Sequence, residues 1–313
     1  MKEYALAVLP YNDFSPQACS ALAVAIQDSI TVFENWNIRI SPDSRLRIAQ
    51  RHLAKMADIG SYGETEKELI KTAKAASLAK DFYEISNTLR KDRDDPIAEE
   101  LAVAIRGTLD GKSKNKSPYA IHSQYWIGML FAHGGLRPAV LSKSNGTKPD
   151  FVVSVGTLDL VVEVKRPHSV KSALRCLEAA ADQLRGSKMP GIICLDLSEC
   201  IVTDDLIIPR EGVWARKVID ERMSAAQEEL ISHIDSYTSS NKFSRIIDLV
   251  IFARYWVWKS LHPPENDVGF TFRIHPFADA CSGLIWREIN LFQEKVRKGM
   301  NELSEAVAYS LKW

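Results

Sequence analysis

The hydrophobic positions in the first third of the chain recur with a helical period. Between Pro16 and Trp36, alanine, leucine, isoleucine and phenylalanine residues lie three or four positions apart and form one apolar stripe. Similar patterns predict three further helices, over Asp43 to Ala57, Glu64 to Leu89 and Ile97 to Leu109. The alternation that is typical of a strand occurs in this part from Tyr4 to Leu9. We therefore expect a helical N-terminal part.

A polar segment from Asp110 to Pro118 follows, with glycine, serine and three closely spaced lysines. Its composition is typical of a linker or an exposed loop. A solvated loop tip explains the lysines better than a binding site does. The segment divides the chain into a predicted helical N-terminal domain, residues 1–115, and a second domain, residues 116–313.

After this segment, short β-prone runs alternate with amphipathic helices. The expected order is a helix at Tyr119–His133, strands at Pro138–Leu141, Phe151–Val155 and Leu158–Val164, a helix at Ser169–Leu184, a strand at Gly191–Leu197, a helix at Val213–Tyr237, strands at Ile246–Trp258 and Phe270–Ile274, and a helix from Ile285 to Leu311. Gly299 is a candidate break in the last helix. The order predicts an α/β (mixed α+β) fold with a mixed central sheet.

Composition narrows the class of protein. With 313 residues, 46% hydrophobic and 26% charged, the chain can bury a sizeable core. Its 40 basic and 40 acidic residues cancel, so nucleic-acid binding would need a local basic patch. Five widely spaced cysteines favour reduced thiols over a disulfide framework or a zinc site. The apolar runs are too short for a signal peptide or a membrane span, so we expect a cytoplasmic protein that does not contact membranes.

Candidate chemistry lies in the segment from Lys148 to Pro167. Gly156-Thr157 separates two strand-like runs and predicts a hairpin. The alternation of the second strand gives one apolar face, with Leu158, Leu160, Val162 and Val164, and a second face with Asp159, Val161, Glu163 and Lys165. Because Asp150 opens the first strand, antiparallel pairing brings it towards Glu163. We expect Asp150, Glu163 and Lys165 to meet at one end of the hairpin.

These three residue types suit phosphodiester hydrolysis. The reaction needs a divalent cation that polarises the phosphate, and Mg²⁺ prefers one or two carboxylates together with water and substrate oxygens. Asp150 and Glu163 can supply the carboxylates, for Mg²⁺ or Mn²⁺, and Lys165 can orient the attacking water or stabilise developing negative charge. The alternative is a solvated edge strand preceded by a turn residue.

Pro149-Asp150 and Glu163-Val164-Lys165 resemble the two elements of the PD-(D/E)xK nuclease superfamily, which has the restriction-endonuclease-like fold. The predicted order from Tyr119 to Leu197 is also similar to the αβββαβ core of that superfamily. At the level of architecture the resemblance covers about residues 119–275, and it does not extend to residues 1–110. It implies that Asp150, Glu163 and the backbone carbonyl of Val164 are metal ligands and that Lys165 is the catalytic lysine.

The resemblance also implies accessory positions. Many relatives carry a glutamate on the first core helix, where this chain has Gln124 near the expected position. Some relatives place a glutamine on the helix after the lysine, and Gln183 is the candidate here. Four basic residues follow the motif and are candidates for phosphate contacts, with ordinary solvated helix positions as the alternative: Arg166, His168, Lys171 and Arg175.

Three hypotheses of function follow. The first is a metal-dependent nuclease acting on nucleic acid, with DNA as the expected substrate and, by analogy, a role in restriction or phage defence. Its expected partners are nucleic acid, a partner protein of a defence system and a second copy of the chain. The second is a catalytically inactive nuclease-fold module that binds nucleic acid or protein, which the glutamine at position 124 favours. The third is an interaction protein whose helical half carries the function.

Other signals are weaker. The aromatic segment from Tyr255 to Trp258 is better explained by core packing than by stacking on bases. The scattered histidines show no metal-ligand spacing. The glycine-rich motifs of NTPases and dehydrogenases and the serine motif of α/β-hydrolases do not occur in the sequence, which argues against these classes.

Overall fold

The computed structural model describes residues 16–61, 63–89, 97–109, 117–136, 138–140, 149–208, 214–236, 246–261, 264–276 and 283–309. Four helices precede residue 110 among them: α1 (Pro16–Asn35), α2 (Arg45–Asp58), α3 (Glu66–Leu89) and α4 (Ile97–Ala104). The predicted strand from Tyr4 to Leu9 and most of the predicted linker lie outside the described residues. Among the helices described, none is long and apolar enough to cross a membrane.

The N-terminal helices confirm the predicted segments to within a few residues, except at the end of α4. Ser44 caps α2, because its side chain accepts a hydrogen bond from the backbone N–H of Arg47. The helix predicted to reach Leu109 ends at Ala104 instead. The chain then turns through Gly107, with a φ of 96° that favours glycine, and the Tyr119 hydroxyl donates to the carbonyl of Thr108 at 2.7 Å.

The second part contains the remaining elements. These are α5 (Ser117–His133), β1 (Pro138–Val140), β2 (Phe151–Val155), β3 (Leu158–Lys165), α6 (Val170–Arg185), β4 (Gly191–Asp196), α7 (Ser198–Ile201), α8 (Asp204–Ile207), α9 (Ala215–Asp235), β5 (Ile246–Leu261), β6 (Pro264–Pro276) and α10 (Gly283–Tyr309). The short helices α7 and α8 were not predicted. The other elements follow the predicted order, which confirms a mixed α/β fold.

The six strands that the structure describes form one mixed sheet in the order β1-β2-β3-β4-β5-β6. β1, β2 and β3 are antiparallel, β3, β4 and β5 are parallel, and β6 returns antiparallel to β5. Strand β6 is longer than predicted, because its first half pairs with β5 although it contains Glu265 and Asp267. An edge strand tolerates such charges, so the hydrophobic pattern did not indicate where β6 begins.

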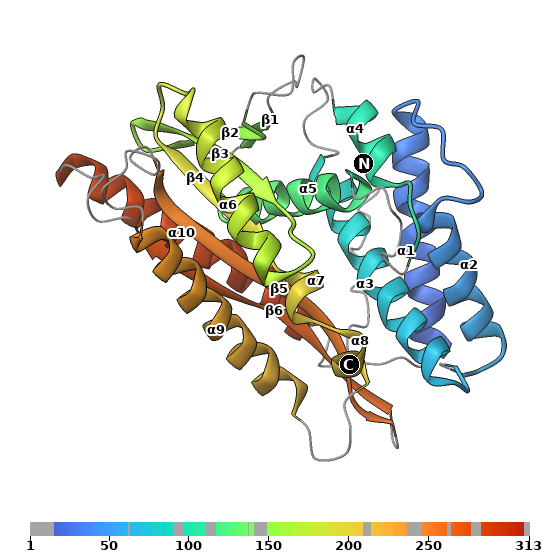
Figure 1. Ribbon diagram of the computed structural model, residues 1–313. Coiled ribbons are helices and arrows are strands. Elements are labelled where there is room, and N and C mark those ends of the chain that lie inside the picture. Colours follow the sequence, from blue (N-terminus) through green and yellow to red (C-terminus); the bar gives the residue numbers. More distant parts are fainter. Residues whose placement is uncertain are drawn as a thin grey trace.

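Helices cover both faces of the sheet (Figure 1). On one face, α6 and α9 pack on alternate residues of β3, β4 and β5, such as Val161, Ile193 and Leu249. On the other face, α5, α10 and the N-terminal helices pack on the intervening residues, such as Val162, Cys194 and Val250. The central strands are therefore buried on both sides, as is usual for parallel strands.

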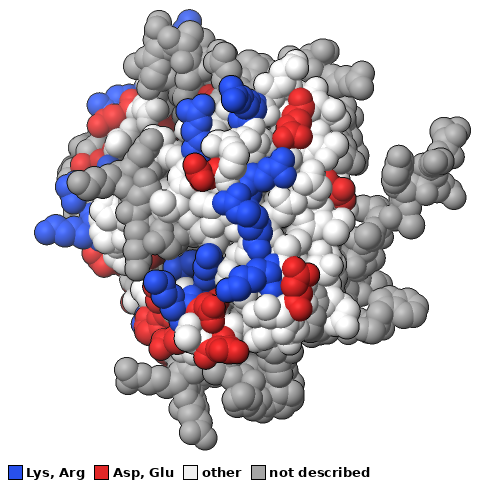
Figure 2. Space-filling view, turned by 90° about the vertical axis from the view of Figure 1, so that its right-hand side faces the viewer, with Lys and Arg blue, Asp and Glu red and all other residues white. Residues whose placement is uncertain are grey.

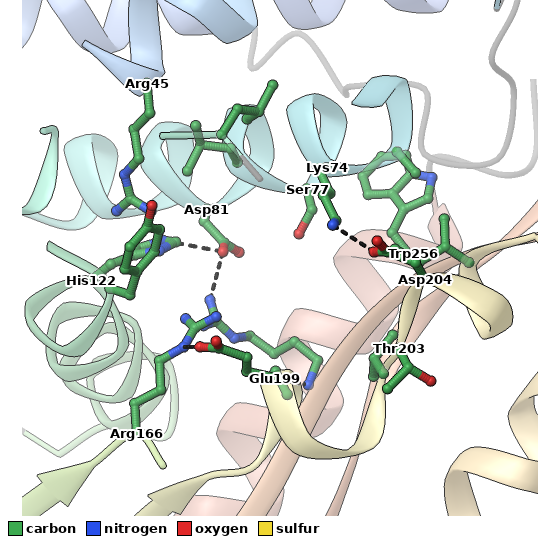
Figure 3. Close-up of a pocket in the computed structure, with 18 residues that line it drawn as sticks. Arg45, Lys74, Ser77, Asp81, His122, Arg166, Glu199, Thr203, Asp204 and Trp256 are labelled. Carbon is green, nitrogen blue, oxygen red and sulfur yellow. Dashed lines mark hydrogen bonds and ion pairs between the residues drawn. The ribbon is translucent and has the colours of Figure 1, made fainter. Parts of the chain in front are cut away.

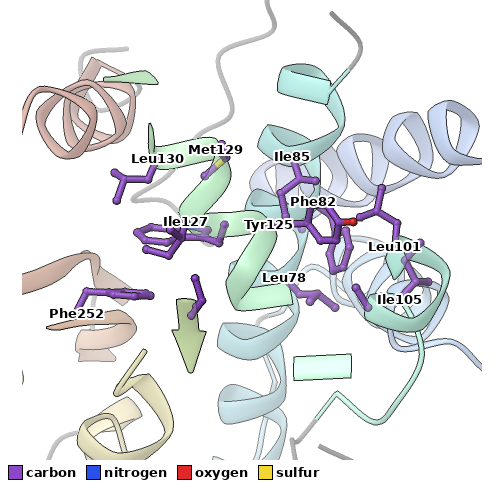
Figure 4. Close-up of a cluster of buried hydrophobic side chains, with 14 of the residues drawn as sticks. Leu78, Phe82, Ile85, Leu101, Ile105, Tyr125, Ile127, Met129, Leu130 and Phe252 are labelled. Atoms are coloured by element: carbon purple, nitrogen blue, oxygen red, sulfur yellow. The ribbon is translucent and has the colours of Figure 1, made fainter. Parts of the chain in front are cut away.

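The N-terminal helices and the sheet share one hydrophobic core. Figure 4 shows Phe82 of α3 and Tyr125 of α5 in the cluster that also contains Phe252 of β5. All described strands lie between Pro138 and Pro276, so no described strand crosses the predicted domain boundary. The division at residue 115 stays a prediction. The segment from Tyr255 to Trp258 is buried, which confirms core packing.

Gly299 does not break α10, which runs through it without interruption. This glycine lies where α10 crosses the C-terminal end of α5, and a Cβ atom there would overlap the carbonyl oxygen of Leu130. It is therefore a position of close approach between two helices, and the prediction of a break was wrong.

Replacing Gly299 by alanine is expected to lower the free energy of unfolding by about 1–3 kcal/mol, because the added methyl group forces α5 and α10 apart. Gly128→Ala in α5 is the matched control, since its Cβ would meet atoms no closer than 3.9 Å. Without a clash, alanine in a helix stabilises by up to about 1 kcal/mol. Urea denaturation compares the two variants, and equal midpoints would contradict this interpretation.

Candidate functional site

The predicted hairpin is formed by β2 and β3. Val155 pairs with Leu158, so the connection has two residues, and Gly156 has a φ of 59° that such a turn requires. The predicted alternation of β3 is confirmed. Leu160, Val162 and Val164 lie in the core beneath α5, and Val161 lies in the core beneath α6.

Asp150 lies just before β2 and is buried. Its backbone N–H donates to the carbonyl of Val162 at 3.0 Å, and its Oδ2 accepts from the N–H of Val164 at 2.7 Å. At the end of β3 the carboxylate thus accepts a hydrogen bond from the backbone N–H that a carbonyl of a neighbouring strand would otherwise accept. This hydrogen bond fixes the side chain of Asp150 beside the backbone of Glu163-Val164-Lys165.

Glu163 and Lys165 form the second half of the cluster. Glu163 is fully buried, and Lys165 Nζ donates to its Oε1 at 2.5 Å. The same ammonium donates to Gln183 Oε1 of α6 at 2.6 Å. The side chain of Lys165 is 25% exposed, so the cluster reaches solvent through the lysine. Sequence spacing therefore placed all three motif residues correctly at one end of the hairpin.

The two candidate glutamines have different positions. Gln183 contacts Lys165, as its place on the helix after the lysine suggested. Gln124 is buried in α5, and its Nε2 has no hydrogen-bond partner among the described residues. Helix α5 packs on the face of β3 opposite that of Glu163, and among the described contacts none joins Gln124 to the motif residues. Its sequence position was close to the expected one, but its helix covers the other face of the strand.

The four basic candidates lie in two different places in the structure. His168, Lys171 and Arg175 are exposed at the start of α6 or just before it. Arg166 turns to the opposite face of the sheet from Lys165, as its neighbouring position on the strand requires. Its guanidinium lies 3.5 Å from Asp196 Oδ2 and 3.8 Å from Glu199 Oε2. Arg166 therefore belongs to a separate cluster and not to the surface beside the motif.

That cluster is a buried ion-pair network at the C-terminal ends of β3 and β4. Arg254 of β5 lies at its centre and pairs with Asp81 of α3 at 2.6 Å and with Asp196 of β4 at 2.8 Å. Asp196 also accepts from the hydroxyls of Ser123 and Ser198. The network ties the N-terminal helices to the sheet.

Burial and charge act in opposite directions on this network. Burial alone would raise the pKa of the Asp196 carboxyl, but Arg254 and Arg166 hold it well below its usual value. The pKa of Asp81 is lowered mainly by Arg254, again against the effect of burial. Burial and the nearby Arg45 lower the pKa of His122 to about 3, so this imidazole is neutral at pH 7. The acids are therefore ionised and compensated by the arginines.

Sequence reasoning missed the network. Arg254 stands within the apolar run of β5, and Asp196 ends the apolar run of β4. A charged residue within such a run is expected to be paired when it is buried. That signal points to the two residues, but the partner on α3, Asp81, is 173 positions from Arg254 and cannot be found by spacing.

The donor set at the motif fits a hard divalent cation. Asp150 and Glu163 bring two carboxylates to one end of the hairpin, and a carboxylate has two oxygens that can bind a cation. Mg²⁺ needs one or two carboxylates from the protein. No group of three or more His, Cys, Asp or Glu side chains able to hold a metal occurs within the described part of the chain.

Comparison of the chain with protein families, curated proteins and solved structures gives no significant match.

Proposed function

We propose that this protein is a metal-dependent nuclease of the PD-(D/E)xK type that hydrolyses phosphodiester bonds, with DNA as its substrate. The observation that carries the proposal is the meeting of Asp150, Glu163 and Lys165 at one end of the β2–β3 hairpin. The element order α5-β1-β2-β3-α6-β4 supports it, because it is the order that the resemblance implies.

Each residue of the motif has its own role in the proposed reaction. Asp150, Glu163 and the carbonyl oxygen of Val164 hold the cation, which when bound polarises the scissile phosphate. In a strand the N–H and the carbonyl of one residue point to the same side, so the carbonyl of Val164 points to the side where Asp150 lies. Lys165 keeps its ammonium beside Glu163, where it orients the attacking water and stabilises the negative charge on the phosphate.

Local positive charge supports nucleic acid as the substrate although the whole chain is neutral. On α2, Arg47, Arg51 and Lys55 recur every four residues and project from one side of the helix. Arg47 and Lys55 are partly compensated by Glu34 at 3.2 Å and Glu68 at 3.9 Å. Figure 2 shows a band of lysine and arginine side chains on the molecular face that lies to the right in Figure 1, where α1 and α2 are found. Such a band suits contacts to phosphates, which position a nucleic acid without reading its sequence.

The test is cleavage of supercoiled plasmid by the purified protein with Mg²⁺ or Mn²⁺. Nicking or linearisation that stops when a chelator is added is the expected result. Parallel reactions with single-stranded DNA and RNA establish the substrate class. Protein that is folded by circular dichroism and leaves every one of these nucleic acids intact with both metals would contradict the proposal.

A catalytically inactive nuclease-fold module is the second candidate. The observation in its favour is that Glu163 is fully buried and already paired with Lys165. In that case the ion pair stabilises the hairpin and the protein binds nucleic acid without cleaving it. Binding of a labelled duplex that is not cleaved with either metal supports this candidate over the first.

The contact between Gln183 and Lys165 gives a separate prediction. Gln183→Leu removes an acceptor from the ammonium and is expected to slow cleavage about 10- to 150-fold, since one hydrogen bond to a charged group contributes about 1.5–3 kcal/mol. Because Gln183 acts through the lysine, kcat should fall while metal affinity and KM stay nearly constant. Gln183→Glu keeps an acceptor and should retain more activity. Equal loss in both variants would show that the contact has no positioning role.

A further inference from the structure

Asp248 is a fully buried acid in the apolar run at the start of β5, on the face of the strand that α10 covers. Gln293 Nε2 of α10 donates to its Oδ2 at 3.0 Å. The other oxygen, Oδ1, has no hydrogen-bond partner among the described residues. No basic side chain in the described part of the chain forms an ion pair with this carboxyl.

The buried acids of the ion-pair network differ from Asp248 in this respect. Asp81 pairs with Arg254 at 2.6 Å, and Figure 3 shows the contacts of its carboxylate. Asp196 pairs with the same arginine at 2.8 Å. A buried carboxylate that lacks such a partner is costly as an anion, so the group binds a proton instead. The contacts of Asp248 therefore favour the neutral acid.

The groups that face Asp248 from the neighbouring elements do not compensate a negative charge. From β4, Cys194 faces the same side, and its thiol stays neutral because burial, Asp248 and Asp150 raise its pKa well above the usual value. The partner position on β6 is Pro276, which carries no titratable group. From α10, Arg297 acts on Asp248, but its side chain is exposed and solvent screens its charge.

Burial raises the pKa of Asp248 to about 7, although Gln293, the N–H of Leu249 and Arg297 act in the opposite direction. In an unfolded chain the pKa of an aspartic acid is about 3.9. The folded protein therefore binds this proton more tightly than the unfolded chain does. The resulting stabilisation is fully present below about pH 3.9 and is lost as the pH rises through about 7.

Helix α10 connects this carboxyl to the hairpin that bears the metal motif. Its apolar side is buried on the sheet through Ile289, Phe292 and Val296. At its first turns, Glu288 accepts a hydrogen bond from Thr157 Oγ1 of the hairpin turn at 3.5 Å. The helix that covers Asp248 therefore also contacts the turn between β2 and β3.

We propose that Asp248 is a proton-binding site that controls how firmly α10 packs on the sheet. With a neutral carboxyl, the apolar contacts and the amide of Gln293 hold the helix in place. Ionisation puts an uncompensated charge beneath the helix, and this loosens α10 together with its contact to the hairpin turn. The proposal concerns the packing of the helix and does not depend on nuclease activity.

Urea unfolding from about pH 5 to 8 tests the proposal. Asp248→Asn keeps the shape of the side chain and removes the titration, while all histidines stay in place. Relative to this variant, the unfolding equilibrium constant of the unchanged protein should increase by up to about tenfold per pH unit and level off above about pH 7. Glu294→Gln, an exposed acid of the same helix, is the control and should keep the unchanged profile. A constant difference between the unchanged protein and Asp248→Asn would overturn the proposal.

Hydrogen exchange, corrected for the intrinsic effect of pH, locates the loosening. Between about pH 6 and 8 the amides of α10 should lose protection, and those of α9 on the opposite face should not. Gln293→Met removes the donor that favours the anion, so the loss should level off at a higher pH. This variant decides the question if Asp248→Asn does not fold. Equal loss of protection in α9 and α10, or an unchanged profile in Gln293→Met, would contradict the role of Asp248.

Discussion

Glu163→Gln is expected to reduce plasmid cleavage at least a hundredfold. The amide keeps the shape of the side chain and still accepts the hydrogen bond from Lys165, but it removes the negative charge that the cation needs. Asp150→Asn should have the same effect, because it also removes a negative charge that the cation needs. The side-chain oxygen of asparagine can still accept from the N–H of Val164, so the hairpin should keep its structure. Calorimetric titration with Mn²⁺ should show weakened metal binding in both variants.

Lys165→Met is expected to abolish cleavage for a different reason. Removing one group that stabilises charge in the transition state lowers kcat about 100–1,000-fold. The carboxylates stay in place, so metal binding should remain close to that of the unchanged protein. Lost cleavage with retained metal binding would distinguish the role of the lysine from that of the two acids. A purely structural role of the buried cluster would not produce this difference.

Asp159→Asn is the matched control for this series. Asp159 lies on the same face of β3 as Glu163 but is exposed and accepts a hydrogen bond from Ser154 at 2.6 Å. Its substitution should leave both cleavage and metal binding unchanged. If the unchanged protein cleaves DNA and the three motif variants cleave it equally well, the motif is a structural feature of the hairpin and the site must lie elsewhere.

The sequence was sufficient to predict the hairpin and its motif because both depend on local rules. Three local features determine where Asp150, Glu163 and Lys165 lie: a glycine at the turn, side chains that alternate between the two faces of the strand, and a polar residue at each strand end. Gln183 was also found, because the resemblance places a glutamine on the helix that follows the lysine. These features need no knowledge of distant parts of the chain.

Features that depend on packing between distant segments were not predictable. Gln124 was expected beside the motif, but only the tertiary packing shows that α5 covers the opposite face of β3. Gly299 was taken as a helix break, because its crossing partner on α5 lies more than a hundred residues earlier. Arg45, Asp81 and Arg254 belong to three segments with no common sequence pattern, so their cluster emerges only in the folded chain.

Arg254→Met is expected to lower the free energy of unfolding by about 3–5 kcal/mol. Methionine has a similar length and suits a buried position, so lost packing is small. The main effect is that Asp81 and Asp196 keep their charges without their closest partner, and an uncompensated buried charge is strongly destabilising. Arg185→Met, which breaks an exposed pair with Asp182, is the control and should change stability by about 0–1 kcal/mol.

The pH dependence distinguishes lost ion pairs from lost packing. The arginine holds the pKa values of Asp81 and Asp196 below their usual values in the folded protein. A depressed carboxyl pKa stabilises the fold above the unfolded pKa, about 3.9, and this stabilisation is lost as the pH falls through the folded pKa. Urea unfolding at about pH 7 should therefore show the full deficit of Arg254→Met, and at about pH 3 the deficit should be smaller, because protonation of the acids in the variant removes the unpaired charges. A deficit that does not change with pH would mean that Arg254 stabilises the fold through packing, and the network would then not be what holds the N-terminal helices to the sheet.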